Sequence, residues 1–402
     1  MILARIFTKI YKEGGIILID AKGQKYICGS PRKEKPITIK LLKENLNWKL
    51  LVDPELEFPE AYMRNDIVIE NATLKEFLMD LIKNLGRGEV STTSAITKRI
   101  YQLCRYLTNF NFPGKSRKNI EHHYDIGGER GEKLYDIFLD TKHRLYSCAY
   151  WKEDTKSLEE AQQNKIDHIV KKLDIKHGQK ILEVGCGWGG MTFEIAKQKN
   201  CEVTGISLSK NQIKYCKQKA KDLSLDNQVN FELIDYRKVK GHYDRIYSVG
   251  MFEHVGKKFY NTFFKSMNKL LKNDGIFLLH TIGVIDKPTP PNKFINKYIF
   301  PGGVCPSYSQ IITPIEKTGL IVSDSETLIR HYDKTLESWL ERFLDKRKEV
   351  KDLFDEKFVK MWEFYMSSVC AAFRHRDLVV FQLQIVKNFQ AAHRTRDYIY
   401  KT

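Results

Sequence analysis

The chain has 402 residues, of which 42 % are hydrophobic and 29 % are charged, and its formal net charge at pH 7 is +17. This composition is typical of a soluble globular protein, and the length allows two domains with a sizeable core. No apolar run approaches the roughly 18 residues that a membrane-spanning helix needs, and the first residues are charged too early for a signal peptide. The eight cysteines contain no C-x-x-C pair, which argues against a metal site or a disulfide framework and predicts a reducing cytoplasm.

The positive charge indicates a polyanionic partner, either nucleic acid or the surface of an anionic membrane. About half of the excess lies in residues 1–120, and no nucleic-acid motif accompanies it. A lysine-rich, well-solvated surface is the alternative, and composition alone does not separate the two.

Residues 1–112 are predicted to form a small α+β domain that docks or binds, because no acid/base constellation occurs there. A helix opens near residue 72 with its apolar positions on one face, and a linking helix is expected at 92–107. A polar, basic stretch at 113–118 marks the domain boundary. The predicted strands span 15–20 and 36–40, with another strand or turn within 62–70.

Strands and helices alternate through much of residues 119–402, the predicted catalytic domain. This pattern predicts an α/β fold with a doubly wound, mostly parallel sheet and a ligand at the carboxyl edge of the strands. Four prolines within 287–301 interrupt the rhythm, so a lid insertion is expected over about 284–345. Helix returns over 335–373, and 381–400 is predicted to be a closing hairpin or terminal strands. The predicted strands are 181–184, 202–208, 230–234, 243–249 and 276–281.

A glycine-rich bend over 180–190 follows the first of these strands and leads directly into a helix. Glycine lets the backbone turn sharply and approach a ligand without a Cβ in the way, and the helix offers free N–H groups. The stretch therefore predicts a nucleotide-type cofactor loop. Its ligand is ambiguous, because Gly185, Gly187 and Gly190 also satisfy the dinucleotide pattern G-x-G-x-x-G.

The position of the nearby acid favours one cofactor. A dinucleotide site wants a carboxylate about 20 residues past the loop, where it holds the ribose hydroxyls. Here the second strand ends at Ser207 and Ser209 without a carboxylate, and the acid is Glu183, directly before the loop. That arrangement is common in S-adenosylmethionine-binding methyltransferases. Gln212 is expected to close a reciprocal cap with Ser209, with an adenosine contact as an additional role.

Six motifs, in family order and spacing over about 118–390, resemble those of the cyclopropane-fatty-acyl-phospholipid synthases, relatives of the mycolic acid cyclopropane synthases. The resemblance implies a Rossmann-like class I S-adenosylmethionine-dependent methyltransferase. The first 110 residues fit more loosely, like the N-terminal lipid-binding extension of the phospholipid-acting members. The motifs are Tyr146–Trp151, Leu182–Gly190, Gly250–Gly256, Leu278–Gly283, Ile295–Pro301 and Cys370–Asp377.

The reaction implied by this resemblance moves a methyl group from S-adenosylmethionine onto a cis double bond of an acyl chain. A base then removes a proton from the new methyl of the carbocation, and the ring closes. In the family this base is a bicarbonate ion. The residues implied to hold it are the backbone at Cys148 and Ile282 and the side chains of Glu253, His280 and Tyr332.

Each of these residues also has an ordinary structural interpretation. A glutamate at a strand end is more often a helix cap, and a histidine in an apolar strand is more often part of the core. Cys370 resembles a family active-site cysteine, but alkene methylation offers it no covalent intermediate, so we expect it to line the acyl pocket. The residues predicted to contact the cofactor are Tyr146, Ser147, Glu183, Gly185, Cys186, Gly187, Trp188, Gly189, Ser207, Gln212, Tyr236 and Arg237.

The implied substrate, an unsaturated phospholipid, lies in a membrane, which explains the basic charge better than nucleic acid does. The expected protein is cytoplasmic, bound peripherally to the anionic inner face of the cell membrane, and a homodimer by resemblance. Phe294, Tyr298 and Phe300 are candidates for an interfacial or acyl-facing surface or for the core. The alternatives are a methyl-branching or alkene-forming lipid methyltransferase, a small-molecule N-methyltransferase and a non-catalytic lipid-binding module.

Overall fold

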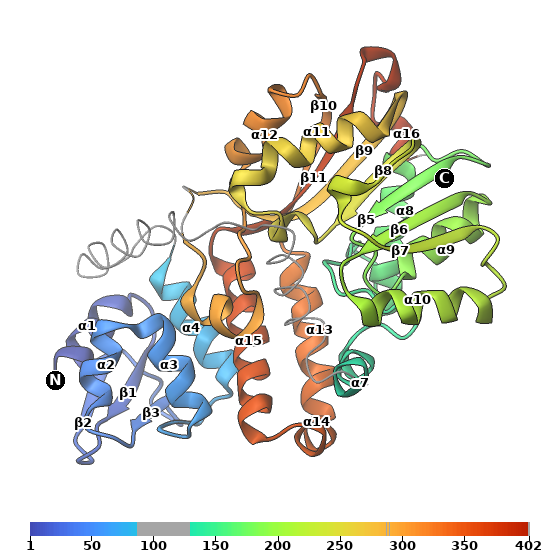
Figure 1. The fold of residues 1–402 in the computed structure, drawn as a ribbon. Helices are drawn as coiled ribbons and strands as arrows, with labels where there is room; N and C mark the ends of the chain where they lie inside the picture. Colours follow the sequence, from blue (N-terminus) through green and yellow to red (C-terminus); the bar gives the residue numbers. More distant parts are fainter. Residues whose placement is uncertain (87–128, 287, 289, 401–402) are drawn as a thin grey trace. The chain divides into compact units, whose positions relative to one another are not determined.

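The computed structural model describes residues 1–86, 129–286, 288 and 290–400 (Figure 1). The chain divides into two compact units. Unit 1 comprises Met1–Tyr106, Pro290–Phe300 and Leu336–Asp377, and unit 2 comprises Leu107–Thr289, Pro301–Thr335 and Leu378–Thr402. No helix among the described residues is long and apolar enough to cross a membrane.

Unit 2 is built on a seven-stranded sheet in the order β10-β11-β9-β8-β5-β6-β7. All neighbouring strands are parallel except β11, which runs antiparallel to both β9 and β10. This confirms the predicted doubly wound, mostly parallel sheet. The strands are β5 (Lys180–Val184), β6 (Glu202–Ser207), β7 (Val229–Leu233), β8 (Tyr243–Val249), β9 (Leu271–Val284), β10 (Ile321–Leu328) and β11 (Leu378–Val386).

Helices cover both faces of this sheet (Figure 1). Successive strand residues point to opposite faces, so Ile181 packs in one core cluster and Leu182 in the other. The first cluster draws on α8, α9 and α10, and the second on α11 and α12. The helices of unit 2 are α7 (Glu129–Phe138), α8 (Leu158–Lys172), α9 (Gly190–Lys199), α10 (Lys210–Asp222), α11 (Tyr260–Leu270), α12 (Tyr308–Glu316) and α16 (Asp397–Tyr400), with the 3₁₀ turns Tyr236–Lys238, Phe252–His254, Lys257–Phe259 and Phe389–Ala391.

The predicted ending of the chain is wrong in part. Residues 378–386 form β11, but a 3₁₀ turn and the short helix α16 follow it in place of a second hairpin strand. Besides β9, β11 pairs with β10, a strand that was not predicted from the sequence. Polar residues from Ser323 to Glu326 interrupt the apolar pattern of β10, and they are tolerated because β10 lies at the edge of the sheet.

Unit 1 contains a four-stranded sheet in the order β2-β1-β3-β4, which confirms the α+β prediction. Its strands are β1 (Gly15–Ile19), β2 (Lys25–Gly29), β3 (Thr38–Leu41) and β4 (Ile67–Glu70). The helix predicted from residue 72 is α4, and Thr73 and Glu76 close a capping box at its start. The helices of unit 1 are α1 (Ile2–Ile10), α2 (Leu46–Val52), α3 (Pro54–Met63), α4 (Leu74–Leu85), α14 (Arg347–Leu353) and α15 (Glu356–His375), with a π-helical turn at Ile295–Ile299.

A late part of the chain packs within unit 1. Helix α15 lies against α4 and α3, and the ring of Phe364 lies 6.0 Å from that of Phe58, which stacks on Phe77. Helix α13 (Tyr332–Asp345) contributes residues to both units. Compactness therefore groups 290–300 and 336–377 with the N-terminal residues, whereas the sequence-based limits of 1–112 and 119–402 were contiguous. Those limits stay predictions, and the linking helix and boundary at 92–118 lie outside the described residues.

Candidate active site

A pocket in unit 2 lies where β5, β6 and β8 end. All the residues predicted to contact a cofactor line it except Gly189 and Arg237. Met251 and His254, which follow β8, and Arg144 also line this pocket and were not predicted from the sequence. The remaining lining residues are Leu145, Val184, Met191, Ile206, Leu208, Ile234, Val249 and Gly250.

Close backbone packing explains the glycines after β5. Gly185 has a φ of +94°, and a Cβ there would lie 2.7 Å from the Cβ of Met251. A Cβ on Gly190 would lie 1.9 Å from the carbonyl oxygen of His143. Gly189, with a φ of +81°, faces Phe193 and other core side chains instead of the pocket. The bend therefore combines open backbone for a ligand with contacts that leave no room for a side chain.

Gln212 does not close the reciprocal cap predicted for α10. The hydroxyl of Ser209 accepts the backbone N–H of Gln212 at 3.2 Å, so one half of the cap is present. The side chain of Gln212 instead accepts a 2.8 Å hydrogen bond from the hydroxyl of Ser207. That bond keeps both side chains at the end of β6, in the pocket wall.

Arg237 lies beside the pocket but is occupied by its neighbour. Its Nε and NH2 groups donate to the two carboxylate oxygens of Asp235 at 2.7 and 2.6 Å. This bidentate pair accounts for the guanidinium charge. Tyr236, between the two, does line the pocket.

A buried acid, Glu183, lines the pocket, and a buried base, Lys165, contacts the lining residue Ser147. Glu183 accepts a hydrogen bond from the hydroxyl of Thr192, and burial raises its pKa to about 8. Lys165, on α8, is fully buried and donates to the hydroxyl of Ser147 at 2.7 Å. Burial lowers the pKa of Lys165 to about 8. Lys165 was not predicted as a site residue, although a lysine four residues from both Ala161 and Ile169 on the apolar face of a helix is a detectable signal in the sequence.

A second polar group lies where β8 and β9 end. Glu253 is in the 3₁₀ turn after β8, and its Oε1 accepts the backbone N–H of Ile282, in β9, at 2.6 Å. Within the described part of the chain, its Oε2 is buried without a hydrogen-bond partner. Burial raises the pKa of Glu253 to about 7. The amide of Ile282, predicted to bind an anion, is therefore bonded to Glu253 in this structure, and its anion-binding role stays a prediction.

The other implied anion ligands in unit 2 are buried. His280 lies two residues before Ile282 and shares its face of β9. Its Nδ1 lies 3.0 Å from the amide nitrogen of Gln382, and burial holds its pKa well below the usual value. Burial raises the pKa of the Cys148 thiol, which keeps it neutral. Tyr332, at the start of α13, is 8 % exposed, and the anion-binding roles of these three residues stay predictions.

Cys370 lies in α15 of unit 1 and is fully buried. Its predicted place in an acyl pocket stays a prediction.

Unit 1 exposes apolar side chains that the sequence analysis did not single out. Trp48 and Val52 lie one turn apart on α2 and are 70 % and 52 % exposed, and Leu42 is 54 % exposed. Phe294, in contrast, is 1 % exposed and its ring lies 5.1 Å from that of Phe364. Phe294 is therefore a core residue and not an interfacial one.

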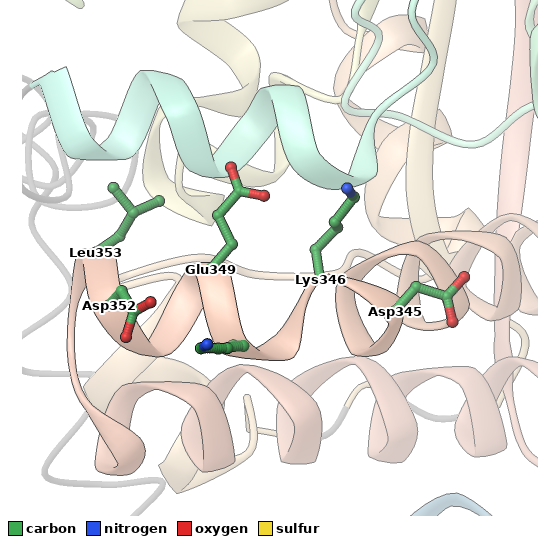
Figure 2. Close-up of a pocket in the computed structure, with 6 residues that line it drawn as sticks. Asp345, Lys346, Glu349, Asp352 and Leu353 are labelled. Atoms are coloured by element: carbon green, nitrogen blue, oxygen red, sulfur yellow. The ribbon is translucent and has the colours of Figure 1, made fainter.

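An open pocket at the end of α13 and along α14 has a different character (Figure 2). All of its lining residues except Leu353 carry charge, and both signs are present. Neither an acyl chain nor an anionic ligand matches this lining, so we assign it no function. The lining residues are Asp345, Lys346, Lys348, Glu349, Asp352 and Leu353.

Comparison with known proteins extends these observations. A family model described as mycolic acid cyclopropane synthetase matches residues 113–383. The chain is 40 % identical to the cyclopropane-fatty-acyl-phospholipid synthase of Escherichia coli K12 over 276 residues, which are 68 % of this chain and 69 % of that protein. It is 32 % identical to the tuberculostearic acid methyltransferase of Mycobacterium tuberculosis over 290 residues, 68 % of this chain and 66 % of that one.

Solved structures of methyltransferases are also similar to this chain. The mycolic acid cyclopropane synthase solved with SAH and CTAB has a TM-score of 0.63 and 31 % identity, over 67 % of this chain and 97 % of that one. Coclaurine N-methyltransferase bound to SAH has a TM-score of 0.65 at 21 % identity, over 83 % of this chain and 99 % of that one. At that identity the likeness concerns the fold alone.

Proposed function

Because the chain belongs to the mycolic acid cyclopropane synthetase family, we propose that it builds cyclopropane rings on the acyl chains of unsaturated phospholipids. It is an S-adenosylmethionine-dependent methyltransferase. The observation that carries the ring-forming proposal is the buried Glu253 carboxyl, with one oxygen unpartnered among the described residues, beside a pocket at the carboxyl edge of the sheet.

The pocket residues fit S-adenosylmethionine. The bend at Gly185 and Gly187 leaves backbone open to the ligand, Ser207 and Gln212 offer polar groups at the end of β6, and Trp188 gives an apolar wall. When bound, S-adenosylmethionine supplies a methyl group on a positively charged sulfur. In this proposal the chain orients that methyl toward the acyl chain and excludes water from the cation that follows.

The residues around Glu253 fit a small oxyanion that carries a proton. An unpartnered buried carboxylate oxygen is costly unless a donor reaches it, and the hydroxyl of bicarbonate is such a donor. When bound, bicarbonate supplies the oxygen base that removes the proton from the cation. Glu253 would accept a proton at Oε2, while the N–H of Ile282 holds Oε1 in place. A pKa of about 7 suits both acceptance and release of that proton near neutral pH.

A methyl-branched product is the second candidate function. Loss of a proton from a neighbouring carbon of the same cation would give a methyl-branched alkene, and transfer of hydride from an external donor to that cation would give a saturated methyl branch. The relative named tuberculostearic acid methyltransferase supports this candidate. The buried carboxyl at Glu253 favours ring closure, because it provides a destination for the proton of the new methyl group.

Unit 1 supports docking on an anionic membrane. It exposes Trp48 and Val52 on α2, and the neighbouring Lys49 and Lys43 are also exposed. Aromatic side chains favour the membrane interface and lysines favour anionic head groups. The proposal places the protein in the cytoplasm on the inner face of the cell membrane, with no nucleic-acid partner. The homodimer implied by the family resemblance is part of the same proposal.

One experiment tests the proposed function. The full chain is incubated with S-adenosylmethionine and vesicles of mono-unsaturated phospholipid, with and without added bicarbonate, and the acyl chains are analysed by mass spectrometry and proton NMR. Ring formation predicts a gain of one CH₂ per modified chain, loss of olefinic protons and new high-field ring protons. A mass gain without ring protons would favour the branched product, and no mass gain would contradict both candidates.

A further inference from the structure

A row of three polar side chains that includes His280 runs across β10, β11 and β9 in the sheet of unit 2. Glu326 of β10 pairs with Gln382 of β11, and Gln382 pairs with His280 of β9, so the three side chains are direct cross-strand neighbours. Lys172 and His168, from α8, cover this row. Polar side chains in the centre of a sheet are expensive to bury unless each hydrogen bond is made, so the pattern of those bonds is informative.

Lys172 determines which way the amide of Gln382 faces. The Nζ of Lys172 donates to the Oε1 of Gln382 at 2.9 Å. A lysine nitrogen with this geometry is a donor, so the atom opposite it must be the amide oxygen. Lys172 is itself held by the carboxylate of Glu326, to which the Nε2 of His168 also donates at 2.7 Å. The amide nitrogen of Gln382 must therefore face His280.

The orientation of Gln382 decides the tautomer of His280. The Nε2 of Gln382 lies 3.0 Å from the Nδ1 of His280. Since an amide nitrogen can only donate, Nδ1 must accept, and the ring proton belongs on Nε2. We infer that Lys172 and Gln382 are positioning residues that hold His280 as the neutral Nε2–H tautomer, so that His280 serves the proposed acid–base site as a hydrogen-bond donor and not as a proton acceptor.

The surrounding charges agree with this assignment. Burial is the main cause that holds the pKa of His280 far below its usual value, and the nearby Lys165, Lys172 and His168 of α8 add to the effect, whereas Glu326 opposes it. Burial alone would raise the pKa of Glu326, but the hydrogen bond with His168 and the charge of Lys172 lower it to about 2. The negative charge therefore stays at the outer end of the row, next to Lys172, and the imidazole stays neutral.

This inference rests on the proposed function in one respect, the assignment of Glu253 and His280 to one acid–base site. A neutral N–H donor can hold an anion without taking its proton, whereas an imidazole with a free acceptor nitrogen would compete for it. The arrangement leaves Glu253 as the side chain that receives the proton. Replacing the outer partners that fix the tautomer of a metal-bound histidine typically costs about 10- to 100-fold in affinity or activity, and we expect a loss of activity of that order here.

The test reads the tautomer directly. The full chain is labelled with ¹⁵N-histidine, and the His280 ring signals are assigned as those that a His280→Gln variant lacks. The expected wild-type spectrum has a protonated Nε2 and an unprotonated Nδ1 from pH 6 to pH 8. A proton on Nδ1, or a doubly protonated ring in this range, would overturn the inference.

Two variants of the row test the cause. Gln382→Glu replaces the donor with an acceptor of the same shape, so a proton should move to Nδ1 and kcat should fall by tenfold or more with little change in the dissociation constant for S-adenosylmethionine. Lys172→Met removes the donor that holds the amide oxygen of Gln382, so the amide can flip by 180° and both neutral tautomers of His280 should be populated. The matched control is Gln384→Glu, the same substitution on the same face of β11, where the side chain bonds to the Lys172 carbonyl and to Tyr398.

The outcomes separate this inference from the proposed function. An unchanged His280 spectrum in Gln382→Glu, or an equal change in Gln384→Glu, would overturn the positioning role. A changed His280 tautomer in Gln382→Glu with undiminished kcat would overturn the claim that this tautomer matters for the proposed reaction. If the wild-type chain forms no ring on any lipid, the proposed function fails, while the ¹⁵N spectra still decide whether Gln382 sets the tautomer.

Discussion

At the scale of single residues, burial determines the chemistry of the candidate site. Glu183 and Glu253 are both ordinary carboxyl groups in the sequence, yet burial raises their pKa values to about 8 and about 7. Burial lowers the pKa of Lys165 to about 8, because it disfavours the charged form of a lysine as it does that of a carboxyl group. Groups that titrate near neutral pH at a sheet edge are typical of functional sites.

Glu253→Gln is expected to lower kcat by about 100-fold or more, the usual contribution of a positioned acid or base. The amide keeps the shape and the hydrogen bond with Ile282 but removes the proton acceptor. Initial rates with vesicle substrate measure the loss, and calorimetric titration of S-adenosylmethionine should show nearly unchanged binding. If the variant no longer binds the cofactor, Glu253 belongs to the cofactor site instead.

The carboxyl of Glu253 should also make the free energy of unfolding depend on pH. Its folded-state pKa of about 7 lies above the value of 4.5 for a free glutamate, so the folded state binds a proton that the unfolded state releases between these pH values. Stability should therefore fall as pH rises from about 4.5 to about 7, by up to about 3 kcal/mol. Urea unfolding at pH 5 and pH 8 should show a smaller fall in Glu253→Gln than in wild type.

The activity should change with pH in the opposite direction to the stability. A proton acceptor must be ionised, so kcat of the wild-type chain should rise with pH through an inflection near 7. A profile that falls through that inflection would mean that the protonated carboxyl is the active form.

At the scale of elements, the carboxyl ends of parallel strands bring the site together. The glycine bend follows β5, Ser207 ends β6, Met251 and Glu253 follow β8, and Ile282 lies near the end of β9. These positions are far apart in sequence but share one edge of the sheet. The alternation of strands and helices predicted this edge as the ligand site, and the family resemblance supplied the further cofactor residues Tyr146, Ser147 and Tyr236.

Gly185→Ala should destabilise the chain more than Gly178→Ala. Both glycines have positive φ angles, +94° and +75°, but a Cβ on Gly178 would meet no atom within 4 Å, whereas one on Gly185 would meet Met251 at 2.7 Å. The backbone cost of about 1–2 kcal/mol is common to both, and the clash adds about 1–3 kcal/mol. Urea midpoints of the two variants without cofactor measure the difference, and equal midpoints would contradict the close approach of Met251.

At the scale of the whole molecule, the chain combines a methyltransferase sheet in unit 2 with a small sheet in unit 1 that exposes apolar side chains. The net charge of +17 would attract the chain to anionic lipid, and the exposed Trp48 would favour the membrane interface. Neither the net charge nor Trp48 is part of the pocket in unit 2.

Trp48→Ala is expected to weaken binding to anionic vesicles by roughly tenfold, because it removes a large apolar group from the interface. Phe389→Ala is the matched control, since Phe389 is an aromatic residue in unit 2 that is 78 % exposed. Vesicle co-sedimentation at rising salt measures both variants, and wild-type binding should also weaken with salt. Equal effects of the two variants, or wild-type binding to neutral vesicles at high salt, would contradict docking through α2 and anionic lipid.

The sequence by itself determined the doubly wound sheet and the glycine loop, because strand and helix periods and turn chemistry are local, and it predicted ten of the 21 lining residues of the pocket, partly through the family resemblance. It did not predict β10, whose polar residues hide an edge strand, or the grouping of α15 with unit 1, which depends on the packing of Phe364 against Phe58. It also missed Lys165, Lys172 and Gln382, since a polar residue reveals its role only through its partners. Only the tertiary structure could decide those partners, because burial and cross-strand register, and not residue type, fix which groups meet.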